Sequence, residues 1–168
     1  MTWTGSDINT AGLNCILNGN AATSETFGPF YGSTQSFSGD TVNVALYGTT
    51  PTTATALTDT LAHNAYNGAG GQWLSANELP TAGGYTQTGT ALGTKTETSA
   101  GTAICKFTGA NVSWTSATFT TYGCLVYDNT VTNKYAYCWN YFGGAQSVAA
   151  GTFTVNWNTS GIFAITCS

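Results

Sequence analysis

Charged side chains are scarce in this sequence, and arginine is absent. Three lysines and seven acidic residues make up 6% of the 168 residues and give a formal net charge of -4. So few cations cannot build the basic surface that nucleic-acid phosphates require. We therefore expect no nucleic-acid partner. A surface of Thr, Asn, Ser and Gly repels neighbouring molecules weakly, which suits a protein held in an assembly or living outside the cell.

Long apolar runs are also missing. No stretch approaches the roughly 20 consecutive apolar residues of a membrane span. Polar residues follow Trp3 where a secretory signal would need a basic and then an apolar region. We expect no membrane association, and a chain that is made and used without Sec export or is presented after processing.

Clustered titratable groups, the usual mark of an active site, are not visible. His63 is the sole histidine, and the carboxylates Asp59, Glu78, Glu97 and Asp128 are scattered along the chain. Serine-hydrolase elbows, phosphate-binding loops and dinucleotide fingerprints are absent. Asp128 begins a turn, where an Asx interaction explains it. The sequence predicts a non-enzymatic protein without a catalytic residue, metal or cofactor.

Threonine, glycine and aromatic residues are plentiful, and aromatics alone make up 13% of the chain. Strands favour Thr and aromatic side chains, whereas Gly and Asn favour tight turns. Apolar residues alternate with polar ones at Val42, Val44 and Leu46 and again at Phe153 and Val155, which is the period of a β-strand. We predict an all-β protein, an antiparallel β-sandwich or jelly-roll-like domain.

The chain divides into two parts. Residues 31–168 are predicted to form the sandwich, and residues 1–30 an irregular N-terminal arm or an extra edge strand. Leu13, Ile16 and Leu17 are the candidate docking residues of this arm. A long glycine-rich loop, residues 68–86, is expected to be anchored by the burial of Trp73 and Leu79.

Two longer apolar runs, residues 119–128 and 134–142, predict a hairpin with a polar loop. If pairing is symmetric about Val131, Leu125 lies opposite Tyr137, Val126 opposite Ala136 and Cys124 opposite Cys138. The five cysteines form no CxxC pair and lack the spacing of a zinc site. Two interpretations remain open: buried thiols, or a cross-strand disulfide between Cys124 and Cys138.

The second run of this hairpin carries alternating aromatic residues at Tyr135, Tyr137, Trp139 and Tyr141. If that face points outward, it could grip a partner protein or stack against sugars; if it points inward, it belongs to the core. The opposite face is also largely apolar, so we expect the hairpin to be covered on both sides. Core or subunit interface is the favoured interpretation.

Several short motifs resemble those of small tailed-bacteriophage virion proteins: VNVALY at 42–47, NEL at 77–79 with GYT at 84–86, VSWT at 112–115, GCLVY at 123–127 and FG at 142–143. The resemblance covers roughly residues 37–166. It implies a β-sandwich or jelly-roll-like subunit, foremost a capsid decoration or cement protein that binds the major capsid protein, and otherwise a head-fibre or tail component.

This resemblance further implies a protein located in the virion and assembled in the host cytoplasm. A homo-oligomer is expected, and a cyclic trimer would fit a capsid lattice. Exposed strand edges, or an arm that adds a strand to a neighbour, would provide the contacts. A receptor-binding or carbohydrate-binding β-module is the alternative function.

Overall fold

The computed structural model describes residues 7–8, 37–49, 65–68, 73–99, 104–130, 132 and 134–166. Every regular element in this part of the chain is a β-strand, and the named strands pair antiparallel. In chain order the strands are β1 (Asp7–Ile8), β2 (Val42–Tyr47), β3 (Thr90–Ala91), β4 (Thr96–Ser99), β5 (Ile104–Thr108), β6 (Val112–Asp128), β7 (Ala136–Val155) and β8 (Phe163–Thr166).

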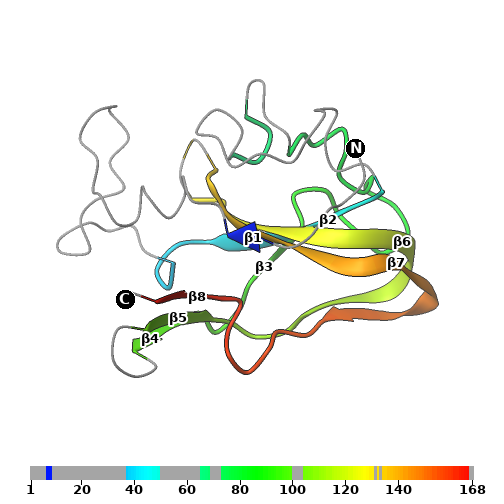
Figure 1. Ribbon diagram of the computed structural model, residues 1–168. Coiled ribbons are helices and arrows are strands. Elements are labelled where there is room, and N and C mark those ends of the chain that lie inside the picture. Colours follow the sequence, from blue (N-terminus) through cyan, green and yellow to red (C-terminus); the bar gives the residue numbers. More distant parts are fainter. Residues whose placement is uncertain are drawn as a thin grey trace.

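The strands form two sheets. Five of them follow the order β1-β7-β6-β2-β3, and three follow the order β4-β5-β8. The two sheets pack against each other, with the smaller one below the larger in Figure 1. The predicted all-β sandwich is therefore confirmed.

Strands β6 and β7 form one long hairpin rather than several separate strands. The sequence predicted only its closed end, whereas the pairing extends to Val112 opposite Val155. In Figure 1 the hairpin crosses the upper layer, turns over at the right and returns in the lower layer. One hairpin thus contributes strand segments to both layers of the molecule.

Two glycines allow this hairpin to fold over. Gly143 and Gly144 have φ angles of 81° and 152°, which side-chain-bearing residues rarely adopt. Residues 142–145 bulge out of β7 at the point where the pairing with β6 shifts between Thr121 and Gly123. Bulges bend the strand that carries them, so the chain can reverse layers without ending the hairpin.

The predicted hairpin register is wrong by two residues. Leu125 pairs with Trp139, Val126 with Cys138 and Cys124 with Asn140. The turn is not symmetric about Val131, because β6 ends at Asp128 and β7 begins only at Ala136. The asymmetric turn accounts for one of the two positions, since Tyr127 pairs with Ala136, and a bulge after Ala136 adds the second.

A bulge near the turn separates two aromatic residues that were predicted to share a face. Val126 pairs with Cys138 and Tyr127 with Ala136, which leaves Tyr137 as an extra residue in β7. An extra residue shifts the alternation of the strand by one position. Consequently Tyr137 joins one core cluster and Trp139 the other.

The first core cluster lies between the sheets and contains Val42, Val44, Leu46, Val126, Tyr137, Phe107 and Phe163 among others. The Phe107 and Phe163 rings stack with centroids 4.3 Å apart. Phe37 meets both rings edge-on. Aromatic pairs at these distances add to the stabilisation from buried area.

The second core cluster covers the other face of the larger sheet. Its members are Ala45, Tyr47, Tyr66, Trp73, Leu125, Tyr127, Ala136 and Trp139. Trp73 is fully buried, as predicted, whereas Leu79 is only half-buried. All six residues of β2 are buried, because apolar side chains cover it from both sides. The expectation that the hairpin is covered on both faces is likewise confirmed at its closed end.

Candidate interaction edge on strand β7

The candidate functional site is the edge of β7 that faces away from β6. Strand β1 covers this edge at Cys138 and Trp139. From Gln146 to Val155, no strand within the described residues pairs with it. An uncovered edge presents a row of backbone N–H and C=O groups to which another chain can add a strand. We call the stretch 146–156 the open edge.

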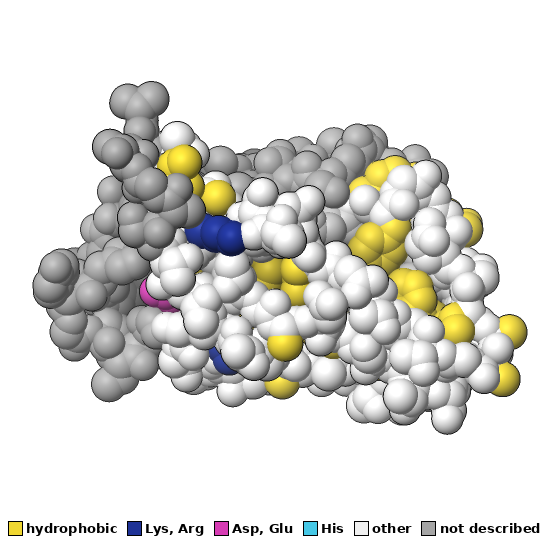
Figure 2. All heavy atoms as spheres, turned by 90° about the horizontal axis from the view of Figure 1, so that it is seen from below, with side chains coloured by type: hydrophobic (Ala, Val, Ile, Leu, Met, Phe, Trp, Pro, Cys, Tyr) yellow, Lys and Arg dark blue, Asp and Glu magenta, His cyan; other side chains and the backbone are white. Residues whose placement is uncertain are grey.

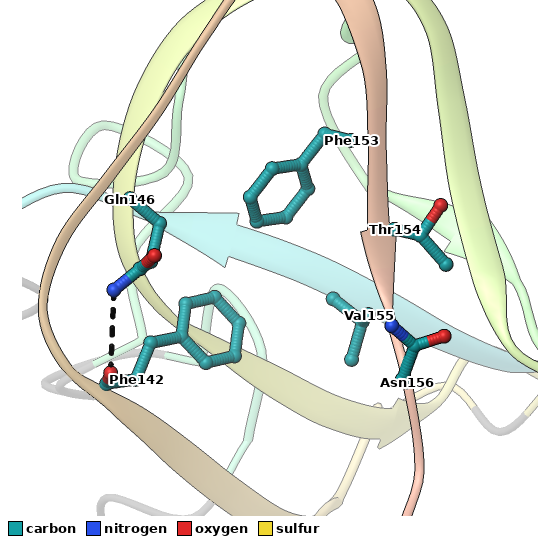
Figure 3. A pocket seen from close by; sticks show the side chains of 6 residues that line it. All are labelled: Phe142, Gln146, Phe153, Thr154, Val155 and Asn156. Carbon is teal, nitrogen blue, oxygen red and sulfur yellow. Dashed lines mark hydrogen bonds between the residues drawn. The ribbon is translucent and has the colours of Figure 1, made fainter.

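An open groove of about 340 Å³ lies beneath this edge. Its lining residues are Phe142, Gln146, Phe153, Thr154, Val155 and Asn156. The Phe142 and Phe153 rings form its apolar floor, with centroids 6.2 Å apart. Gln146 donates a hydrogen bond from Nε2 to the Phe142 carbonyl at 3.4 Å, which holds its amide at the rim (Figure 3).

Side chains alternate along the open edge. Figure 3 shows Phe153 and Val155 pointing towards Phe142, whereas Thr154 points the other way. On that outer side the hydroxyl groups of Thr154 and Ser113 lie 2.8 Å apart. The edge therefore has an apolar face towards the groove and a hydroxyl-bearing face towards solvent.

The open edge carries no charge. Lys134 is the last charged residue of the sequence, so residues 135–168 are uncharged. In Figure 2, which views this side of the molecule, the visible charged side chains lie in the left half, whereas the right half, where the β6–β7 hairpin folds over, shows none. Monomeric proteins commonly guard such edges with lysine, proline or inward-pointing charges. Only backbone bulges interrupt this one.

One of these bulges lies at Ala150, where φ is 49°. Its backbone N–H donates to Thr118 Oγ1 at 2.9 Å, which fixes the bulge against β6. Beyond it, residues 152–156 are again extended, as far as the turn in which Asn158 pairs with Gly161. The regular part of the open edge is thus a segment of about five residues, a common length for a strand.

Two features of the sequence point towards this site. The charge-free run after Lys134 was visible, and so was the Gly143–Gly144 pair. The fold-over of β7 was not, because bulges arise from tertiary pairing. Without it, nothing brings Phe142 next to Phe153.

Contrary to the prediction from the sequence, the alternating aromatic residues of β7 do not share one face. Tyr137 and Trp139 are 2% and 4% exposed and lie in different core clusters. Tyr135 and Tyr141 are half-buried. Neither Tyr137 nor Trp139 offers a ring face to a sugar in this structure. Both belong to the core, which was one of the two interpretations of this face.

Cys124 and Cys138 are free thiols in the structure. Cys124 pairs with Asn140, so the two cysteines are diagonal neighbours and not the opposite pair that the disulfide interpretation needed. Asn140 Nδ2 lies 3.7 Å from Cys138 Sγ. Burial raises the pKa of Cys138 to about 12 and that of Cys124 further still. Such thiols are unreactive at neutral pH.

Glu78 is buried and hydrogen-bonded by tyrosines. Tyr66 donates to its Oε2 at 2.6 Å and Tyr85 donates to its Oε1. The Leu46 backbone N–H in turn donates to Tyr85 Oη at 2.9 Å. Glu78 thereby ties the long loop to strand β2. Desolvation raises the pKa of this carboxyl group, although the hydrogen bonds lower it in part.

Asp128 ends strand β6 and is fully buried. Its Oδ1 accepts from the Thr130 backbone N–H at 2.8 Å, which is the Asx interaction that the sequence predicted. Its Oδ2 accepts from Tyr137 Oη at 3.2 Å. The tyrosine on the bulge and the turn of the hairpin are therefore joined through one carboxylate.

Several predictions fall outside the described residues. They are His63 and the arm residues Leu13, Ile16 and Leu17, and within residues 1–30 only β1 is described. Where the structure is described, it contains neither a helix suited to crossing a membrane nor a group of His, Cys, Asp or Glu side chains arranged to hold a metal.

Comparison with known proteins gives no relative for this chain. No family model, no curated protein and no solved structure matches it.

Proposed function

We propose that this protein is a non-enzymatic structural protein of a virion, a capsid decoration or cement protein that binds the major capsid protein and stabilises the head. The open edge of β7 is the observation that carries the proposal, because it is suited to holding other proteins. The motif resemblance described above supplies the virion setting. A head-fibre or tail component would use the same edge.

An edge of this kind suits a protein that works in many copies. Strand addition supplies backbone hydrogen bonds, and side chains that enter pockets supply specificity. Each hydrogen bond contributes only about 1 kcal/mol net. Repetition over many sites multiplies weak contacts by avidity, and a lattice of identical subunits provides such repetition.

A carbohydrate-binding module is the second candidate function. The groove combines two phenyl rings with the amide side chains of Gln146 and Asn156 and has no charged lining residue. Aromatic rings can cover the apolar face of a sugar, and amides can hydrogen-bond its hydroxyl groups. This candidate no longer rests on Trp139, whose ring is buried.

Immunoelectron microscopy tests the first proposal. Antibodies against the protein should label the heads of tailed-phage particles from cultures that produce it. Label on the tail would move the protein to the tail component, and particles without label would contradict a virion role. A glycan array separates the second candidate: wild-type binding that Phe142→Ala abolishes would favour carbohydrate recognition.

A further inference from the structure

We propose that the open edge pairs antiparallel with the same edge of a second copy, so that the lower layer continues across two molecules. This inference rests on the proposed role in assembly and names one partner for the site. The pairing is two-fold, because each copy contributes the same segment to it. The segment is residues 152–156, between the bulge at Ala150 and the turn at Asn158.

The lack of charge on this edge favours a second copy as its occupant. The whole protein carries a net charge of -4, so two copies brought together at a charged surface would repel each other. Strand β7 has no charged residue on either side of its bend, so the open edge is uncharged. It therefore has no charge with which to select an acidic or basic partner. An identical uncharged edge meets it without an electrostatic cost.

The edge is also already used for strand addition. Strand β1 pairs with β7 at Cys138 and Trp139, on the edge that faces away from β6. The open edge is the continuation of this same edge beyond the Gly143–Gly144 bend. Pairing with a second copy would use, in the lower layer, the same edge of β7 that β1 uses in the upper layer.

The residue pattern fixes the register of the proposed pair. Opposite residues in an antiparallel pair share a face, so apolar residues must meet apolar ones. Centring the pair on Thr154 puts Phe153 opposite Val155 of the second copy, on the groove side. The outer side then pairs Thr154 with Thr154 and Thr152 with Asn156. A shift of one residue would place Phe153 against Thr154 or Asn156 of the second copy.

This arrangement gives each groove a new wall. Phe153 is half-buried and Val155 is 6% exposed in the single chain. The opposing pair would bring further apolar side chains against Phe142 and Phe153. Burying exposed apolar surface is stabilising, so the two grooves contribute along with the backbone hydrogen bonds.

Cysteine cross-linking tests the inference. In the proposed register the Thr154 Cα atoms of the two copies lie about 5 Å apart, within reach of a disulfide. The Thr152 residues are offset by roughly 14 Å along the strands, beyond that reach. Mild oxidation of Thr154→Cys should give a covalent dimer linked through residue 154, identified by peptide mapping. Thr152→Cys, the matched control, should stay at least tenfold less linked.

Sedimentation of the untagged wild-type protein completes the test. A dimer at micromolar concentration is expected. A wild-type monomer, or equal linking of the two cysteine variants, would overturn the second-copy inference. The proposed function would survive that result if the monomer still bound capsids through the open edge, whereas binding to neither capsids nor a second copy would remove both. Dissociation of the dimer by a free saccharide would also contradict the inference.

Discussion

The Glu78 carboxyl group links the stability of the protein to pH. Burial raises its pKa above the usual value of 4.5, so the folded state holds this proton more tightly than the unfolded state does. The stabilisation by the protonated form is complete below the usual pKa. It is lost as the pH rises through the raised pKa of the folded state.

Replacing Glu78 with Gln should remove this dependence. The amide keeps the size of the side chain and an oxygen that can accept from Tyr66 or Tyr85 but does not ionise. Denaturant unfolding between pH 4 and pH 8 should show Glu78→Gln gaining stability relative to wild type as the pH rises. Other carboxyl groups are common to both proteins and cancel in the difference. Parallel pH profiles would contradict the assignment.

The two buried thiols give a second test at this scale. Iodoacetamide at pH 8 should leave Cys124 and Cys138 unlabelled in the folded protein, because their raised pKa values keep them protonated. Unfolding without a reductant should expose both to labelling. Cys105, which is half-buried, serves as the internal reference. Failure to label Cys124 and Cys138 after unfolding would indicate a disulfide.

Residue burial was predictable where it depends on side-chain type. Trp73 was expected in the core and is there, because the burial of a large aromatic ring is what can anchor a glycine-rich loop. The division between Tyr137 and Trp139 was not predictable. It depends on one extra residue in β7, and a bulge leaves no periodic trace in the sequence.

Among the elements, the folded-over hairpin decides the architecture. Its two strands supply pairing partners in both layers, and the bend at Gly143 and Gly144 is what allows this. Strands of this length would otherwise run straight out of a molecule of this size. The bend is therefore the element whose alteration should matter most to the open edge.

Gly143→Ala tests the bend. A Cβ at Gly143 meets no atom within 4 Å, but its φ of 81° disfavours any side chain. We expect a loss of about 1–2 kcal/mol in the free energy of unfolding. Gly48→Ala is the control, because its Cβ also meets no atom within 4 Å and its φ lies outside the left-handed region. That variant should be unchanged or slightly more stable. Equal effects of the two substitutions would contradict a conformational role for Gly143.

Strand positions were predicted best where the alternation of apolar and polar residues marks the strand. Strand β2, at Val42–Tyr47, contains the alternating residues Val42, Val44 and Leu46 from which a strand was predicted. The extent of β6 and β7 was missed, because glycines that bend a strand look in a sequence like glycines that end it. The hairpin register was missed because neither the asymmetry of the turn nor the bulge at Tyr137 is visible in the sequence.

For the whole molecule, the sandwich class followed from composition and alternation. The open edge did not, because it depends on which strands cover which edges after folding. In the described part of the structure, the outer edge of β7 has no strand partner after the bend, and this same stretch lines an apolar groove. The proposed function therefore depends on the claim that this edge holds other proteins.

Binding to purified phage heads tests that claim most directly. Thr152→Lys places a charge on the open edge, where lysine opposes strand addition. Thr115→Lys adds the same charge at another exposed threonine, on the neighbouring strand β6 and outside the open edge. In co-sedimentation, wild type and Thr115→Lys should bind heads equally, and Thr152→Lys should bind at least tenfold more weakly. Full binding by Thr152→Lys would contradict the account.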